Sequence, residues 1–406
     1  MLEQFLKPYR VLDLSDEKGA FCGKLLGDLG ADVIKVEPPT GDSMRFRGPF
    51  AGNEVHPEKS LHFLYFNTSK GSITLNIETS GGRDIFRTLA GKADVVIESF
   101  PSGYLASLGL DYPKLRDENP RLVMCSITPF GQKGPLSRYK AADIVVMAMS
   151  GYMQLIGDPG GEPLVPGGEQ SFYPASQYAA VGIAAALFWR DAISGEGQRI
   201  DVSMQEAMIT YYQEQTPATM WCKTGQNLSP IGAMGGIAPP CGIYPCKDGW
   251  FSFSVVTPEE WDTLAHWMHE VTGNDEVLEE KYRGGFFARI PHRDMVNALI
   301  IEFADRLSAR ELFLEGQKRN LAVLPVNTVA DLLEDQQLNE RGFWVNLDHP
   351  VVRELRYPSL PYYSGTSGGA PRKAAPLLGE DNVRIYCGEL GYSLEDLSVL
   401  RTAGTI

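Results

Sequence analysis

The sequence has little cysteine and histidine for its length, with six of each in 406 residues. The closest cysteines, Cys241 and Cys246, have no histidine beside them, whereas a zinc site usually combines tighter cysteine pairs. His266 and His269 could share one helix face but lack a third ligand. We therefore expect free thiols in a reducing compartment and no bound metal.

The sequence also lacks an excess of positive charge and any long apolar run. Its net charge is -14 at pH 7 and it has no polybasic stretch, which disfavours nucleic acid or an anionic membrane as a partner. No window approaches the roughly 18 apolar residues of a membrane-spanning helix. The opening MLEQFLKPYR has no apolar segment typical of a signal peptide. We expect a cytoplasmic protein with no nucleic-acid and no membrane partner.

What the sequence does contain is an alternation of short apolar strands and helices. With 43% hydrophobic residues, the chain can form one large domain and a smaller one. Continuous apolar strands alternating with helices are typical of an α/β fold whose sheet is covered on both faces. Strands are predicted at 9–14, 32–36, 72–77, 93–98 and 122–128, and helices at 19–29, 81–89 and 173–192.

A change of amino-acid composition in the middle of the chain indicates a domain boundary. A stretch rich in Gly and Pro at 231–245 interrupts the alternation, and charged helices follow it. We predict four segments: a large domain beginning with 1–205, a linker at 206–230, a small domain at 231–330, and a return segment at 331–406 that completes the large domain.

A set of short motifs then occurs in a specific order. They include YRVLDLS at 9–15, DVIKVEPPTGD at 32–42, FNTSKGSITLNI at 66–77, GKADVVIESFPSG at 91–103 and PLLGEDN at 376–382. Each is weak alone. In this order they make the chain resemble, over roughly residues 9 to 395, the family III CoA-transferases, which include the formyl-CoA transferases and a racemase branch.

The resemblance implies a fold and a chemistry. Members of this family have a Rossmann-like large domain built from both chain ends and a smaller domain from the middle, and two chains interlock as a dimer. An aspartate carboxylate attacks an acyl-CoA thioester, and CoA moves to a second carboxylic acid through an anhydride and an enzyme-bound thioester. The implied ligands are small carboxylic acids and coenzyme A thioesters, the latter as substrate, with no permanently bound cofactor.

The nucleophile of that chemistry is missing here. In the family, the aspartate lies ten residues before the glycine that matches Gly182, and this position holds Phe172. Phenylalanine has no nucleophilic atom, so no catalytic residue is expected at that position. The nearest acid, Glu169, lies three residues earlier and is a weak candidate, because such a shift displaces a carboxylate by several ångströms.

Several other positions match residues that the family places near CoA. Lys140 and Asp143 lie in the KAAD stretch, where the family has a lysine near CoA and an acid near the reaction centre. Asp143 is therefore a second weak catalytic candidate. Asn67, Lys70 and Phe100 also match and complete the predicted CoA contacts. Structural alternatives stay open: Asn67 could cap a turn, Phe100 could be core, and Lys140 could lie on a solvated face.

Other positions depart from the family where it contacts the phosphates of CoA. The family usually has QAGP at the positions where this chain has KGAF (18–21), and Lys-Arg where this chain has KG (70–71). It often has arginine at the positions where this chain has Pro38 and Pro39, and again where this chain has Ser107. Phosphates bind cations and backbone N–H groups. The resemblance thus implies a weakened CoA site. The glycine-bearing run 232–236 matches a loop that closes over the intermediate, or is an ordinary connection.

Several functions therefore stay open. The favoured one is a subunit that lacks the nucleophile and supports a homologous sister subunit carrying the aspartate, as in two-chain family members that act on an aromatic acid. A self-sufficient homodimer with a displaced nucleophile is the first alternative. A 2-methylacyl-CoA racemase is disfavoured because Ala142 stands where that branch has histidine. An acyl-CoA-binding protein without catalysis is the weakest.

Overall fold

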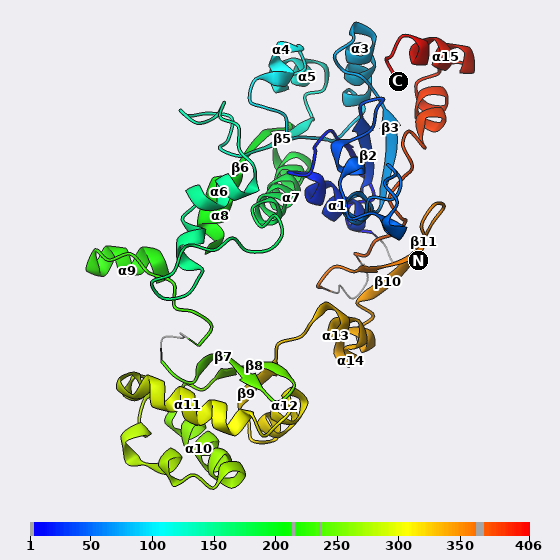
Figure 1. The fold of residues 1–406 in the computed structure, drawn as a ribbon. Coiled ribbons are helices and arrows are strands. Elements are labelled where there is room, and N and C mark those ends of the chain that lie inside the picture. Colours follow the sequence, from blue (N-terminus) through cyan, green and yellow to red (C-terminus); the bar gives the residue numbers. More distant parts are fainter. Residues whose placement is uncertain (1–3, 213–215, 235–237, 363–368) are drawn as a thin grey trace. The chain divides into compact units, whose positions relative to one another are not determined.

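The structure is a computed structural model that describes residues 4–212, 216–234, 238–362 and 369–406 (Figure 1). The chain divides into two compact units. The first consists of Met1–Tyr152, Gly167–Ala218 and Gln337–Ile406, and the second of Met153–Pro166 and Thr219–Gln336. Both chain ends thus contribute to the first unit, which we call the large unit, and the middle of the chain forms the small unit.

The large unit is built on a parallel six-stranded sheet in the order β3-β2-β1-β4-β5-β6. The order reverses between β1 and β4, which is the switch point of a Rossmann-like fold. The predicted α/β class is therefore confirmed. The strands are β1 (Arg10–Asp13), β2 (Asp32–Glu37), β3 (Lys70–Thr74), β4 (Val95–Glu98), β5 (Val123–Thr128) and β6 (Arg199–Ser203).

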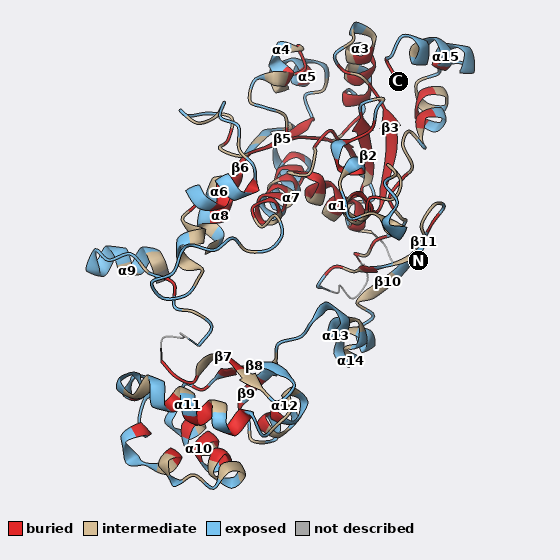
Figure 2. Cartoon of the chain, viewed as in Figure 1, coloured by how far each residue is buried: buried red, intermediate tan, exposed pale blue. Residues whose placement is uncertain are grey.

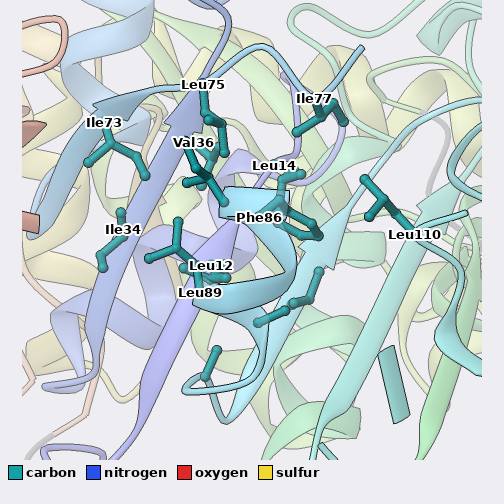
Figure 3. Packing of buried hydrophobic residues seen from close by; sticks show 14 of the residues in the cluster. Leu12, Leu14, Ile34, Val36, Ile73, Leu75, Ile77, Phe86, Leu89 and Leu110 are labelled. Atoms are coloured by element: carbon teal, nitrogen blue, oxygen red, sulfur yellow. The ribbon is translucent and has the colours of Figure 1, made fainter. Parts of the chain in front are cut away.

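Helices cover both faces of this sheet. Alternate strand residues such as Leu12, Ile34 and Ile73 point to one face and pack on Phe86 and Leu89 of α3 (Figure 3). On the other face, α7 contacts β5, β6 and α1. The helices of the large unit are α1 (Ala20–Asp28), α2 (Leu61–Phe66), α3 (Ser80–Ala90), α4 (Tyr104–Ser107), α5 (Tyr112–Glu118), α6 (Asp143–Met149), α7 (Phe172–Trp189), α8 (Met204–Tyr212) and α15 (Leu394–Thr402).

The C-terminal segment attaches to the edge strand β3. The Ser72 N–H donates to Asp381 Oδ2 (2.9 Å), and the Tyr386 hydroxyl donates to the Thr74 carbonyl (2.7 Å). Ile385 and Ile406 are buried in the same core as the sheet. Before this segment, β10 (Trp344–His349) and β11 (Arg353–Pro358) form an antiparallel pair. The return segment therefore supplies both core and edge contacts to the large unit.

The small unit has its own sheet and its own core (Figure 2). Strand β8 pairs antiparallel with both β7 and β9, and Trp261, Trp267 and Phe303 are among the buried residues of the core. The elements are α9 (Thr216–Thr224), which spans the boundary at 218, β7 (Cys241–Cys246), β8 (Gly249–Ser254), α10 (Pro258–Thr272), α11 (Arg293–Ala304), α12 (Ala309–Lys318), β9 (Ala322–Pro325) and α13 (Val329–Glu334). Helix α14 (Gln336–Glu340) begins at the last residue of the small unit and otherwise belongs to the large unit.

Two predicted segment boundaries differ from this division. The stretch predicted as a linker, 206–230, contains most of α8 and all of α9. Residues 153–166, predicted in the large domain, group with the small unit. Both differences have the same cause: local composition marks Gly- and Pro-rich breaks, whereas contacts between distant segments decide which unit a segment joins.

Candidate functional site

The large unit has a cavity of about 790 Å³ at the carboxyl ends of its strands. Open α/β sheets bind ligands at this edge because the loops that follow the strands converge there. The lining comes from residues after β1 (Leu14, Asp16), after β2 (Pro38 to Ser43 and Phe46), after β3 (Leu75 to Glu78) and after β4 (Phe100, Tyr104), with Val36 and Gly404.

The charged groups that line this cavity are carboxylates. Asp16, Asp42 and Glu78 line it, and no Lys, Arg or His is among its lining residues in the described part of the chain. Pro38 and Pro39, also in the lining, have no backbone N–H to offer. Phosphates favour cations and free N–H groups. The cavity is thus poorly suited to hold the phosphates of CoA.

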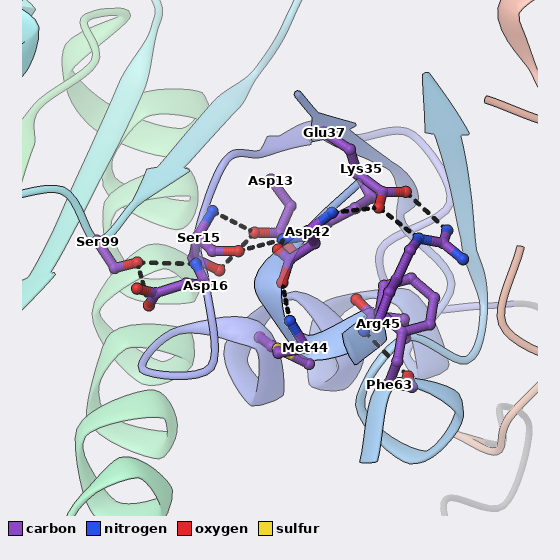
Figure 4. Close-up of polar contacts among 12 residues, drawn as sticks. Asp13, Ser15, Asp16, Lys35, Glu37, Asp42, Met44, Arg45, Phe63 and Ser99 are labelled. Carbon is purple, nitrogen blue, oxygen red and sulfur yellow. Dashed lines mark hydrogen bonds and ion pairs between the residues drawn. The ribbon is translucent and has the colours of Figure 1, made fainter. Parts of the chain in front are cut away.

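The cations nearest this edge are bound by carboxylates of the chain itself (Figure 4). Lys35 Nζ lies 2.7 Å from Asp42 Oδ2 and also contacts the Ser15 carbonyl. Burial alone would lower the pKa of Lys35, but Asp42 and Asp13 hold it above its usual value. The nearby Arg45 guanidinium pairs with Glu37 at 2.6 and 2.8 Å. The positive charge is thus neutralised inside the protein.

Lys70 and Asn67, predicted as CoA contacts, lie in the core. The Lys70 ammonium donates to Asp13 Oδ2 (2.7 Å), the Ala20 carbonyl (2.9 Å) and Asn67 Oδ1 (2.9 Å), so all three of its N–H groups are used. The Asn67 amide donates to the Phe63 carbonyl at the end of α2, as its structural alternative suggested. Both side chains are fully buried. This placement favours a structural role for the pair.

The other two predicted contacts are placed differently. Phe100 lines the cavity and packs against Tyr104, with ring centroids 4.8 Å apart. Lys140 is exposed on the segment before α6 and is not among the cavity residues. Only Phe100 is therefore brought to the cavity at the sheet edge, and a CoA contact for either residue stays a prediction. Of the run 232–236, residues 235 and 236 lie outside the described residues.

The start of α7 carries the position predicted for the nucleophile. Phe172 is the first residue of α7 and is 7% exposed. Its neighbour Tyr173 packs edge-on against Phe21, with centroids 5.6 Å apart, and against Phe66 at 6.0 Å. An aromatic cluster therefore occupies the beginning of the helix where the family resemblance predicts a reactive carboxylate.

The two weak catalytic candidates, Asp143 and Glu169, are both bonded to other residues of the chain. Asp143 Oδ1 accepts hydrogen bonds from the Ser171 N–H (2.8 Å) and hydroxyl (2.6 Å), and burial raises the pKa of Asp143. Glu169 forms an ion pair with Arg47, which also contacts Glu17 at 3.2 Å. Asp143 thus holds the residue before α7, and Glu169 is tied to a cation.

Sequence reasoning missed Arg47 and the acidic cavity residues Asp16 and Glu78. A signal for the acids existed, because each follows a predicted strand and the carboxyl ends of parallel strands share one edge. Nothing in the sequence pairs Arg47 with Glu169, since 122 positions separate them (169 − 47).

Within the described residues, no helix is both long and apolar enough to cross a bilayer. In the same residues, no three His, Cys, Asp or Glu side chains gather in a way that could hold a metal ion.

Comparisons with known proteins agree on one family. The model of CoA-transferase family III matches residues 6–382. The chain is 34% identical to succinyl-CoA:(R)-benzylsuccinate CoA-transferase subunit BbsE of Thauera aromatica, over 96% of both chains. It is 30% identical to the succinyl-CoA–L-malate CoA-transferase alpha subunit of Chloroflexus aurantiacus, over 98% of this chain and 91% of the relative.

A solved structure gives the same result. The crystal structure of a CAIB/BAIF family protein from Brucella suis matches with a TM-score of 0.85 and 29% identity, over 95% of this chain and 99% of that one. The relatives named above are CoA-transferases, so the racemase alternative is not favoured. As its motifs predicted, the chain belongs to CoA-transferase family III.

Proposed function

We propose that this chain is the subunit without the nucleophile in a two-chain CoA-transferase, and that a homologous sister chain supplies the aspartate and the functional CoA site. The observation that carries this proposal is Phe172, buried at the start of α7 where the family resemblance places the aspartate. The transferase step forms a bond between a carboxylate oxygen and an acyl carbon and releases CoA thiolate. A phenyl ring cannot form that bond.

Glu169 is a poor substitute for the missing group. Its carboxylate is paired with Arg47, and its side chain is 21% exposed. To attack a thioester, the Glu169 carboxylate would have to break its ion pair with Arg47 and move toward the position of Phe172. Covalent attack tolerates little displacement. This favours a two-chain CoA-transferase over a homodimer with a displaced nucleophile.

The carboxylates at the sheet edge support the same reading. Asp16, Asp42 and Glu78 line the cavity, and Lys35 and Lys70 are committed to Asp42 and Asp13. A chain that bound CoA itself would be expected to keep cations free for the phosphates. A supporting subunit is under no such constraint.

The surface of α7 supports a partner chain. This helix has no charged residue, yet one face of it is exposed. Exposed apolar residues at helical spacing usually mark an interface. We propose that the sister chain covers this face, as part of an interlocked dimer. Its largest members are Tyr178, Val181, Phe188 and Trp189.

The substrates proposed for the complex are a CoA thioester and small carboxylic acids. The relative that is 34% identical is named for succinyl-CoA and (R)-benzylsuccinate, and the second is named for succinyl-CoA and L-malate. We therefore propose succinyl-CoA as donor and an acid of the dicarboxylic class, such as benzylsuccinate, as acceptor.

The test compares this chain alone with its complex. The chain is produced by itself and together with a family member that retains the aspartate, and each preparation is assayed for CoA exchange between succinyl-CoA and benzylsuccinate. We expect an inert chain, an active one-to-one complex, and unchanged activity of the complex when Glu169→Gln is introduced here. The control replaces the aspartate of the sister chain and should abolish exchange.

Two results would overturn the proposal. One is exchange by this chain alone at the rate of the complex. The other is an acyl or CoA adduct on Glu169, trapped with hydroxylamine and located by mass spectrometry, which would establish the homodimer with a displaced nucleophile.

A further inference from the structure

A second cavity lies on the large unit between the sheet and the segment that carries α4 and α5, and we call it the α4–α5 cavity. Its volume is about 260 Å³, room for several water molecules or one small ligand. Its polar lining includes Glu98, Asp111, Ser126, Gln132 and Arg199, and its apolar lining includes Leu105 and Met124. None of these residues lines the larger cavity at the sheet edge.

The deep side of this cavity holds buried polar groups without partners. Glu98 and Ser126 are opposite each other in the β4–β5 pairing, so both side chains point to the same face of the sheet. Ser126 is fully buried, and its Oγ lies near enough to Glu98 to lower the pKa of that carboxyl group, but it makes no well-formed hydrogen bond in the described part of the chain. Glu98 is 4% exposed, and its Oε2 accepts a hydrogen bond from the Phe100 N–H at 2.8 Å.

Asp111 adds a second carboxylate. It immediately precedes α5, but its side chain does not cap the helix. Its Oδ1 is buried and has no hydrogen-bond partner among the described residues. An unpaired buried polar atom costs about 1–3 kcal/mol, so the concentration of such atoms around one cavity indicates that something else satisfies them.

Arg199 supplies the opposite charge. It is the first residue of β6, it is exposed, and within the described residues its guanidinium makes no ion pair or hydrogen bond. The cavity therefore runs from an outer cation to inner carboxyl groups. A ligand that matches this pattern carries an anionic group at one end and a donor of several hydrogen bonds at the other.

We propose that the α4–α5 cavity binds a small zwitterion of the free α-amino-acid class, with its ammonium on Glu98, Asp111 and Ser126 and its carboxylate on Arg199. The ammonium brings three N–H donors to these acceptors, of which Asp111 Oδ1 and Ser126 Oγ have no partner in the described part of the chain. A quaternary ammonium would leave them unsatisfied, and a plain carboxylic acid would meet Asp111 with like charge. This site is independent of the transferase role, since it needs neither a nucleophile nor CoA.

The charges around Glu98 give the site a pH dependence. Burial raises the pKa of Glu98 to about 7, although Ser126, the Phe100 N–H and Arg199 act to lower it, and Asp201 adds to the increase. Asp111 is the other carboxyl group in the lining. An ammonium binds more strongly to an ionised carboxylate, so affinity should rise as the pH increases from about 6 to 8.

Calorimetric titration of the full-length chain, with any partner that purifies with it, tests this proposal. The probes are glycine, L-alanine and L-serine, with ethylamine and propionate as probes that carry only one of the two charges. We expect one-to-one binding of at least one amino acid, about tenfold tighter than either single-charge probe, which is the ratio expected from one charge-assisted contact.

Variants locate the binding. Ser126→Ala and Arg199→Gln should each weaken it about tenfold, and Glu98→Gln should remove its pH dependence. Arg199 is exposed, so its variant should fold normally. The matched control is Arg116→Gln on α5, an exposed arginine outside the lining that pairs with Glu196. A cavity that holds only water would show no binding of any amino acid. The proposal would be overturned by that result, by equal binding of the single-charge probes, or by binding that neither Ser126→Ala nor Arg199→Gln weakens.

Discussion

Lys70 shows how a residue that matches a ligand contact can serve the fold instead. Its ammonium is fully buried and is shared among Asp13, the Ala20 carbonyl and Asn67. The Lys35 ammonium also helps to hold the pKa of Asp13 below its usual value, although burial acts in the opposite direction. Removing one charge from such a group leaves the other buried without full compensation.

We predict that Lys70→Met lowers the free energy of unfolding by about 3–5 kcal/mol, because Asp13 would lose its closest cation in the core. The measurement is urea denaturation followed by circular dichroism. The matched control is Lys318→Met, which breaks an exposed pair with Glu315 on α12 and should leave stability nearly unchanged, because water and salt screen that pair. A loss as small as that of the control would contradict the structural role assigned to Lys70.

Single elements of the small unit depend on local capping. Thr257 begins α10 with a reciprocal pair of bonds: its hydroxyl accepts from the Glu260 N–H at 3.2 Å, and Glu260 Oε2 accepts from the Thr257 N–H at 2.9 Å. Pro258 follows in the first turn, where its missing N–H costs nothing. The helix then buries Trp261 and Trp267 in the core of the small unit.

We predict that Thr257→Ala destabilises the small unit by about 1 kcal/mol, because the Glu260 N–H in the first turn loses its acceptor. Thr257→Ser keeps the hydroxyl and should unfold close to the unmodified chain. Tryptophan fluorescence during urea denaturation reports on this core through Trp261 and Trp267. If the alanine and serine variants unfold together, the capping bond contributes nothing measurable.

Element boundaries show where sequence patterns stop being informative. Strand 9–14 and helix 173–192 were predicted close to β1 and α7, because continuous apolar runs reflect burial directly. The strand predicted at 72–77 is β3 at Lys70–Thr74. A lysine and a glycine do not look like strand residues, yet Lys70 lies inside the sheet because Asp13 of β1 neutralises it.

At the scale of the whole molecule, α7 has a core face and an uncovered face. Ile183 and Leu187 are buried, whereas Val181 is 67% exposed and Phe188 is 68% exposed. Burial of such residues is worth about 25 cal/mol per Å² of apolar surface. The proposed sister chain would therefore gain much of its binding energy from this helix.

We predict that Val181→Glu weakens assembly with the sister chain at least about tenfold, because a charge would be buried without a partner. Native mass spectrometry of the co-expressed chains measures the fraction of complex. The control is Val399→Glu on α15, where the valine is equally exposed at 66% but no partner is proposed. Equal amounts of complex for both variants would exclude α7 from the interface.

The sequence by itself determined the family, the α/β alternation and the absence of an aspartate at Phe172. These conclusions depend on the order of motifs and on the identity of single residues, and both can be read directly from the sequence. Only the tertiary structure decided that Lys70 points to Asp13, that carboxylates line the cavity at the strand ends, and that Glu98 lies opposite Ser126. Each of these depends on strand register or on side chains that are far apart in the chain. The neighbours that folding brings to a buried group determine whether that group is stable in its charged form.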